Sequence, residues 1–344
     1  RRHTRSGRVT GVQTCALPIC QNTTASNNTA VGQNSLGANT TGAFNTAVGN
    51  SALTANTTSG YNTAVGNLAL TANTTATFNT AVGHGALTAN TTGTINTAVG
   101  ASALAANTTG NSLSAFGHDA LRFNTTGTYN AAFGNLSLFS STTASQNTAI
   151  GYGALYDNTT GANNVAVGYL ALQNNTTASY NTTVGMNALG TTISSTAQTA
   201  VGYNALRLAT GHYNTALGYE ASGSNTTGVE NVAIGANAAA SNTSGGSNVS
   251  VGSHAFLDNT TGSNNTTLGS YALSNNTTAS NNTAVGFQAL YANTTGADNT
   301  AIGNGSLSSC SSGASNVAVG INCASSLNTG THNSLLGRDC GGSL

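Results

Sequence analysis

The chain has 344 residues, and only 14 of them carry a formal charge, seven arginines and seven acids, which is 4 % of the sequence. An ordinary globular domain is about 25 % charged. Residues 21–344 contain three widely separated arginines and no lysine, so the sequence offers no basic patch and argues against nucleic acid as a partner. No run of 18 apolar residues is present, so we expect no direct membrane segment in this chain.

Residues 1–20 differ from everything that follows. They hold four of the seven arginines, two of the five cysteines and the only proline. Residues 9–19 resemble the conceptual translation of a common short-read sequencing adapter. We therefore expect 1–20 to be a non-native leader and the chain to be a fragment from a metagenomic assembly, the alternative being a short native leader with an apolar patch. Residues 21–344 are expected to form a single repeat domain.

The motif Asn-Thr-Ala-Val-Gly organises this domain, starting at Asn28–Gly32. Its glycine occurs nineteen times, and seventeen of the eighteen intervals are 17 residues. The interval from Gly202 to Gly218 is 16 residues, with the missing residue in a turn, where a deletion is tolerated best. Such a regular short period is typical of a repeat architecture.

Alignment on the glycine defines further columns. The preceding residue is always large and apolar, the residue two before is mostly Ala, and the residue four after is mostly Leu. The residue four before is Asn in all copies but two, Leu113 and Gln198. A 17-residue unit is too short for two helices, and Gly, Asn and Thr are poor helix formers. The pattern predicts an all-β, parallel β-solenoid of about 19 coils, whose stacked copies share one core.

Stacking at about 4.8 Å assigns a role to two columns. The glycine fits a corner that needs positive φ or close backbone approach. The asparagine forms a ladder whose amides bond to the coils above and below. One large apolar column is expected inside the coil and part of the other at a subunit interface, and the sequence leaves open which is which. The structural columns begin with Gly32, Gly49, Gly66, Gly83 and Gly100, and with Asn28, Asn45, Asn62, Asn79 and Asn96.

These columns resemble the head repeats of trimeric autotransporter adhesins, and more closely the 17-residue repeats of bacterial and phage proteins described as tail-fibre-like. The resemblance covers Asn28 to about Gly337. It implies a left-handed β-roll and a homotrimer of three rolls around an axis. The unit is longer than the usual adhesin-head unit, with the extra residues at the Asn-Thr-Thr turn.

The turns and cysteines each allow two interpretations. Thirteen turns carry a glycosylation sequon, and we favour turn chemistry, in which Asn tolerates a left-handed conformation and its side chain caps the turn, over glycan attachment. Cys323 and Cys340 share a column on consecutive coils; small buried fillers are favoured over a disulfide. The sequons begin at Asn39, Asn56, Asn73, Asn90, Asn107, Asn124, Asn158, Asn175, Asn225, Asn242, Asn259, Asn276 and Asn293.

Aromatic side chains form two partial columns beside turns, where we expect them to face solvent. Such a stripe could bind a glycan or protein by stacking, or simply stabilise adjacent coils. The candidate ligand stripe, five residues before the glycine, is Phe44, Tyr61, Phe78, Tyr129, Tyr180 and Tyr213; a second column, one after it, is Tyr152, Tyr169, Tyr203, Tyr219 and Phe287.

The sequence predicts no catalytic, cofactor-binding or metal site, and no enzyme. His84 and His118 share a column but lie two coils apart, roughly 10 Å, too far to share a metal ion. The seven acids are dispersed, and a lyase on a longer-coiled β-helix is the weakest alternative.

We expect an extracellular fibre segment at a cell or virion surface, a rigid stalk or head that mediates attachment. Its partners are itself and an unidentified glycan or protein ligand. The main alternative is an ice-binding solenoid that uses the Asn-Thr-Thr ladders.

Overall fold

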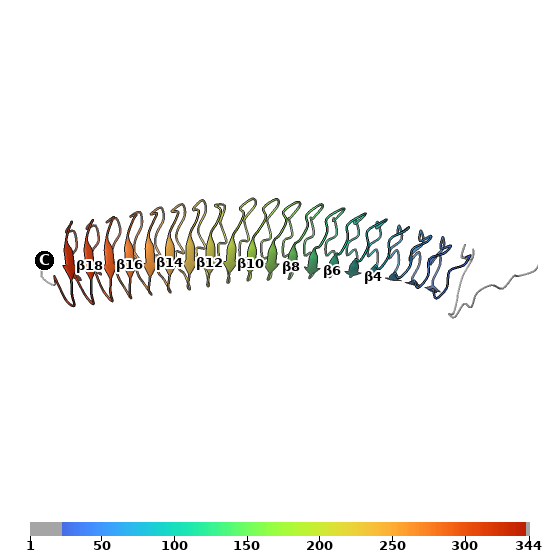
Figure 1. The fold of residues 1–344 in the computed structure, drawn as a ribbon, viewed down its shortest axis with the longest axis horizontal. Helices are drawn as coiled ribbons and strands as arrows, with labels where there is room; N and C mark the ends of the chain where they lie inside the picture. Colours follow the sequence, from blue (N-terminus) through green and yellow to red (C-terminus); the bar gives the residue numbers. More distant parts are fainter. Residues whose placement is uncertain (1–22, 342–344) are drawn as a thin grey trace, which may run out of the picture. The chain divides into compact units, whose positions relative to one another are not determined.

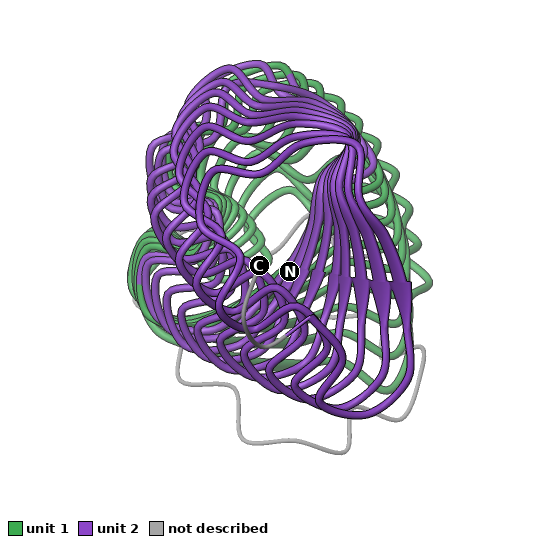
Figure 2. Ribbon diagram, turned by 90° about the vertical axis from the view of Figure 1, so that its left-hand side faces the viewer, with its two compact units in different colours: residues 1–169, 175–177 green, residues 170–174, 178–344 purple. Residues whose placement is uncertain are grey.

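The computed structural model describes residues 23–341, so the expectations for residues 1–20 lie outside the described part of the chain. The described residues are all-β, with nineteen three-residue strands and no helix, and they form a parallel β-solenoid (Figure 1). Contacts divide the chain into two compact units. Of the described residues, unit 1 contains 23–169 and 175–177, and unit 2 contains 170–174 and 178–341 (Figure 2).

Each unit is a ladder of parallel strands in sequence order. The strands of unit 1 are β1 (Thr29–Val31), β2 (Thr46–Val48), β3 (Thr63–Val65), β4 (Thr80–Val82), β5 (Thr97–Val99), β6 (Ser114–Phe116), β7 (Ala131–Phe133), β8 (Thr148–Ile150) and β9 (Val165–Val167). Those of unit 2 are β10 (Thr182–Val184), β11 (Thr199–Val201), β12 (Thr215–Leu217), β13 (Val232–Ile234), β14 (Val249–Val251), β15 (Thr266–Leu268), β16 (Thr283–Val285), β17 (Thr300–Ile302), β18 (Val317–Val319) and β19 (Ser334–Leu336).

The strand register confirms the repeat that the sequence predicted. Thr29 pairs with Thr46, one 17-residue period later. Across the shortened interval, Thr199 pairs with Thr215, so the strands keep their columns although one residue is missing. The deletion is therefore absorbed between the strands, as expected for a change in a turn.

Small side chains and one leucine column fill the coil. In the second coil Ala47, Ala52 and Leu53 are fully buried, and their equivalents repeat this burial in most coils. Successive side chains of a strand point to opposite faces, so the central residue points inward while its two neighbours point outward. This resolves the choice that the sequence left open: the leucine column is internal, and the apolar residue before each glycine lies outside.

The predicted asparagine ladder is confirmed. The backbone N–H of Asn45 donates to Oδ1 of Asn28 at 2.8 Å, and Nδ2 of Asn45 donates to the carbonyl of Ser59 in the next coil at 2.9 Å. The same pattern continues through Asn62 and Asn79. Asn45, Asn62 and Asn79 are almost completely buried, so each amide satisfies backbone groups that have no access to water.

The turn asparagines form a second internal ladder, which the sequence analysis did not anticipate. Nδ2 of Asn56 donates to Oδ1 of Asn39 at 2.8 Å and to the carbonyl of Ser59 at 3.0 Å, so the capping role is confirmed. The left-handed conformation that Asn tolerates is not used in this column: none of the thirteen turn asparagines has positive φ. The ladder needs the amide inside the coil, and the left-handed residues lie at neighbouring corners.

The backbone conformation at the corners confirms the predicted role of the glycine column. Three further columns also have positive φ. The repeat glycines have φ between +121° and +145°, and a Cβ on Gly32 would lie 2.6 Å from the carbonyl oxygen of Gly49. The three further columns are left-handed and consist mostly of residues other than glycine, including the buried leucines, with Leu53 at φ +52°. A left-handed leucine costs roughly 1–2 kcal/mol. Burial of its side chain in the core offsets this cost.

Candidate functional site

The outward face of the strands is uncharged along both units. In every strand the residue before the glycine is large and apolar, and it is exposed or half-buried. The other outward position carries Thr, Val, Ser or Ala. We call these two columns the strand face. A row of exposed apolar side chains of this kind is a candidate interaction surface.

The candidate ligand stripe is exposed, as expected. Its rings are between 49 % exposed, at Phe44, and 67 % exposed, at Tyr180. Phe44, Tyr61 and Phe78 stack on one another with ring centroids 5.0 and 5.1 Å apart. Stacking covers both faces of Tyr61 and one face each of Phe44 and Phe78. These three rings therefore stabilise adjacent coils, whereas Tyr129, which follows Ser112 in this column, has no aromatic neighbour on the preceding coil.

The second aromatic column is also exposed. Tyr152 and Tyr169 stack at 5.5 Å in unit 1, and Tyr203 and Tyr219 stack at 5.3 Å in unit 2. The pKa of the Tyr219 hydroxyl is raised, chiefly by the negative charge of Glu220 and also by burial and Tyr203. A side-chain hydrogen bond from this hydroxyl to the Glu220 carboxylate raises the pKa of Tyr219 further.

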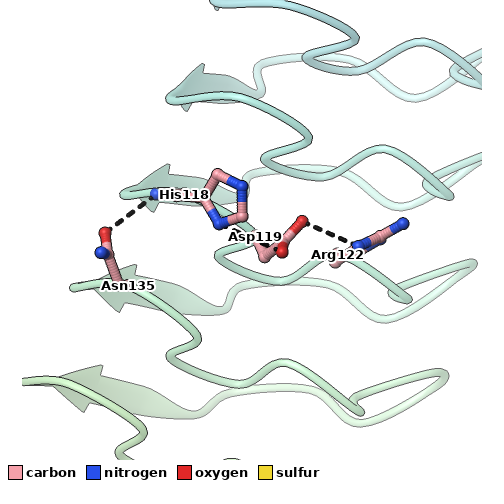
Figure 3. Close-up of polar contacts among 4 residues, drawn as sticks. All are labelled: His118, Asp119, Arg122 and Asn135. Carbon is pink, nitrogen blue, oxygen red and sulfur yellow. Dashed lines mark hydrogen bonds and ion pairs between the residues drawn. The ribbon is translucent and has the colours of Figure 1, made fainter.

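One group of charged side chains gathers beyond β6, and the sequence analysis missed it. Asp119 is 6 % exposed; its Oδ1 accepts from Nη1 of Arg122 and its Oδ2 contacts Nδ1 of His118, both at 3.1 Å (Figure 3). The backbone N–H of His118 donates to Oδ1 of Asn135 in the next coil at 3.1 Å. Asp119 has φ +57°, a corner conformation that no simple sequence motif announces.

This group holds its charges in fixed places. Each carboxylate oxygen of Asp119 contacts one of its neighbours, so Asp119 positions Arg122 and His118. The guanidinium of Arg122 also lies 5.4 Å from the ring centroid of Phe123, a distance that allows cation–π attraction. His118 presents its remaining ring nitrogen outward, because Nδ1 faces the carboxylate.

Of the other described residues, Arg338 and Asp339 form an ion pair, with Nε and Oδ2 3.3 Å apart. Among residues 23–341, no three His, Cys, Asp or Glu side chains gather where they could hold a metal ion. Burial raises the pKa of Asp157, which lies on a coil of unit 1. Within the same described range, no helix is long and apolar enough to cross a bilayer.

The structure pairs Cys323 with Cys340, so the favoured interpretation of two small fillers is wrong and the disulfide alternative holds. Their Cα atoms lie 4.7 Å apart on consecutive coils, which is within the usual range for a bridge. Cys310 is a free buried thiol in the turn ladder, and burial raises its pKa. It fills the place of a ladder asparagine, with Sγ 3.6 Å from the carbonyl oxygen of Gly313.

The thirteen sequon asparagines are at most 2 % exposed, which favours turn chemistry over glycan attachment. The amide nitrogen that a glycan would need is committed to the internal ladder, as at Asn90, where it donates to Asn73 and Gly93.

Comparisons with known proteins add no relative. No protein-family model matches the chain, and a search of curated proteins gave no match.

Proposed function

We propose that this chain is a structural and adhesive fibre segment, a rigid stalk or head that mediates attachment at a cell or virion surface. The resemblance to adhesin heads and tail-fibre-like repeats supports an extracellular homotrimer of left-handed β-rolls. The observation that carries the proposal is the strand face. Nineteen strands present an apolar column with no charged residue on either outward position, and a single chain leaves it uncovered.

Burial of the strand face between copies of the chain favours self-association. Strand neighbours lie about 4.8 Å apart, so each unit carries a continuous apolar stripe. Covering apolar surface contributes roughly 25 cal/mol per Å². An uncharged stripe meets an identical stripe without like-charge repulsion, which makes other copies of the chain its natural partner.

Sedimentation equilibrium of the full 344-residue chain tests the proposal. We expect a mass three times 33.8 kDa. Val65→Asp together with Val99→Asp puts charges on the strand face and is expected to reduce the mass to that of one chain. Thr75→Asp is the matched control, because Thr75 is exposed at a turn away from the strands. A wild-type chain that stays folded and monomeric would contradict the trimer.

Ice binding is a second candidate with one observation in its favour. The first threonine of each turn is a poor candidate, because Thr40 and Thr91 donate their hydroxyls to carbonyls of the next coil at 3.0 and 3.1 Å. On the strand face, however, five consecutive strands, β1 to β5, present an outward Thr in register. A thermal-hysteresis assay decides: no ice shaping at high protein concentration eliminates this function.

A further inference from the structure

A polar groove lies across three consecutive coils of unit 2. It has a volume of about 300 Å³ and is lined by Asn204, Arg207, Glu220, Gly223, Ser224, Ala240 and Ser241. The groove spans the shortened interval between Gly202 and Gly218. Its volume is at the lower end of the range for ligand pockets, about 300–1,000 Å³, which suits a small ligand.

The sequence explains why the surface is hollow here. Five residues after the glycine, unit 2 carries Arg207 on one coil and Leu257 three coils later, with Gly223 and Ala240 between them. Tyr291 occupies the same column further along unit 2. Two successive small residues therefore leave a depression between larger neighbours.

The groove presents one group of each charge. Arg207 occupies the same column as Arg122 of unit 1, but the residue three before it is Asn204, where Arg122 has Asp119. Arg122 is held in an ion pair, whereas Arg207 makes no ion pair within residues 23–341. Its guanidinium is thus a set of donors for a ligand, and the Glu220 carboxylate is an acceptor. Opposite charges in one groove favour a neutral ligand.

The groove wall also contains an incompletely satisfied polar group. Oδ1 of Asn204 is shielded from solvent and has no hydrogen-bond partner. Such atoms are rare in native structures, and each calls for a ligand, a water or a rotation of the amide. Rotation of the Asn204 amide would bring a polar atom of this lining residue toward the groove.

An aromatic ring stands beside the groove. Tyr219 immediately precedes Glu220, is 53 % exposed and stacks on Tyr203 with one face. On the next coil its column carries Ala236, so no aromatic ring covers its other face. Tyr219 is a sequence neighbour of the lining residue Glu220, and its half-exposed ring can supply the C–H packing that a sugar ring makes in addition to hydroxyl hydrogen bonds.

We propose that this groove binds one or two rings of a neutral saccharide. Arg207 donates to its hydroxyl groups, Glu220 accepts from them, and Tyr219 packs against a C–H face of the sugar. The inference gives the proposed attachment function a ligand class. It does not require the trimer, because all of the residues belong to one unit of one chain.

The test uses the full chain and a panel of neutral disaccharides, lactose, maltose and cellobiose, in isothermal titration calorimetry. We expect the wild-type chain to bind at least one of them. Arg207→Ala is expected to weaken binding about tenfold or more, equivalent to about 1.4 kcal/mol. Ala240→Tyr is expected to abolish binding by filling the groove, and it should fold, because Tyr156 and Tyr291 occupy this column in other coils.

Arg122→Ala is the matched control, because it removes the equivalent arginine outside the groove and should leave binding unchanged. Absence of binding to all three sugars by the wild-type chain would overturn the proposal, as would binding that survives both Arg207→Ala and Ala240→Tyr. Binding of free glycine in place of sugars would assign the groove to a zwitterion and also overturn it. Sedimentation of Ala240→Tyr separates this outcome from failure of the fibre proposal, since self-association does not depend on the groove.

Discussion

Asn62 is the most direct probe of the asparagine ladder. It is fully buried, and its Oδ1 accepts the backbone N–H of Asn79 at 3.0 Å. Its Nδ2 donates to the carbonyl of Ala76 at 2.9 Å and to Oγ of Ser59 at 3.1 Å. Asn62→Ala removes all three bonds at once.

The free-energy cost of Asn62→Ala depends on which groups lose their last hydrogen-bond partner. The carbonyl of Ala76 keeps a second donor, Nδ2 of Asn73 at 3.0 Å. The backbone N–H of Asn79 loses its acceptor inside the coil, and an unsatisfied buried donor costs about 1–3 kcal/mol. We therefore expect Asn62→Ala to lower the local free energy of opening by about 2 kcal/mol.

Hydrogen exchange with mass spectrometry measures this locally, which suits a repeat protein whose coils need not unfold together. Peptides covering residues 57–81 should lose protection about 30-fold, the equivalent of about 2 kcal/mol. Asn67→Ala in the same coil is the control, since Asn67 is exposed and its bonds to Asn50 are long, at 3.4 and 3.5 Å. Equal loss of protection in the two variants would refute the ladder argument.

Three further predictions concern the corners, the bridge and the sequons. Gly83→Ala should destabilise its coil by at least about 3 kcal/mol in hydrogen exchange, since φ is +136° and the Cβ would lie 2.5 Å from the Gly100 carbonyl oxygen. Gly85→Ala, at φ +64° with open space around it, should cost only about 1 kcal/mol, and equal costs would contradict the corner argument. Replacing Cys323 and Cys340 by Ser should raise proteolysis of the last coils, because closing a 17-residue loop contributes about 3 kcal/mol; unchanged cleavage would count against the bridge. The folded chain treated with an oligosaccharyltransferase should keep its intact mass, because Asn90 and its equivalents are buried, and glycan addition without unfolding would contradict the second ladder.

The repeat period and the roles of some side chains could be predicted from the sequence. This was possible where a single physical requirement makes one residue type recur in a column. Gly32 and its equivalents recur because a Cβ would meet the backbone of the next coil. Asn45 and its equivalents recur because one amide side chain both accepts the backbone N–H of Asn62 and donates to the carbonyl of Ser59. The low charge fits the same geometry, since a charged column would place like charges next to each other.

Features that depend on the backbone path of the coil could not be predicted from the sequence. Val48 and Leu53 are both large and apolar, and only the backbone turn between them decides that Leu53 points inward. Left-handed conformation at Leu53 contradicts its own preference and is imposed by burial. The contacts of Asp119 and the groove beside Arg207 arise from single departures from the repeat, which a consensus of columns averages away.

Cysteine cross-linking on the strand face tests directly whether this face joins copies of the chain. In a trimer with parallel chains, identical positions of the apolar column meet, so Val65→Cys should form inter-chain disulfides under mild oxidation of the full chain. Thr75→Cys, exposed at a turn of the same coil, should behave as the wild-type chain. Efficient cross-linking of Val65→Cys alone is the predicted result. Absence of cross-linking in Val65→Cys, or equal cross-linking in both variants, would contradict trimer assembly through the strand face.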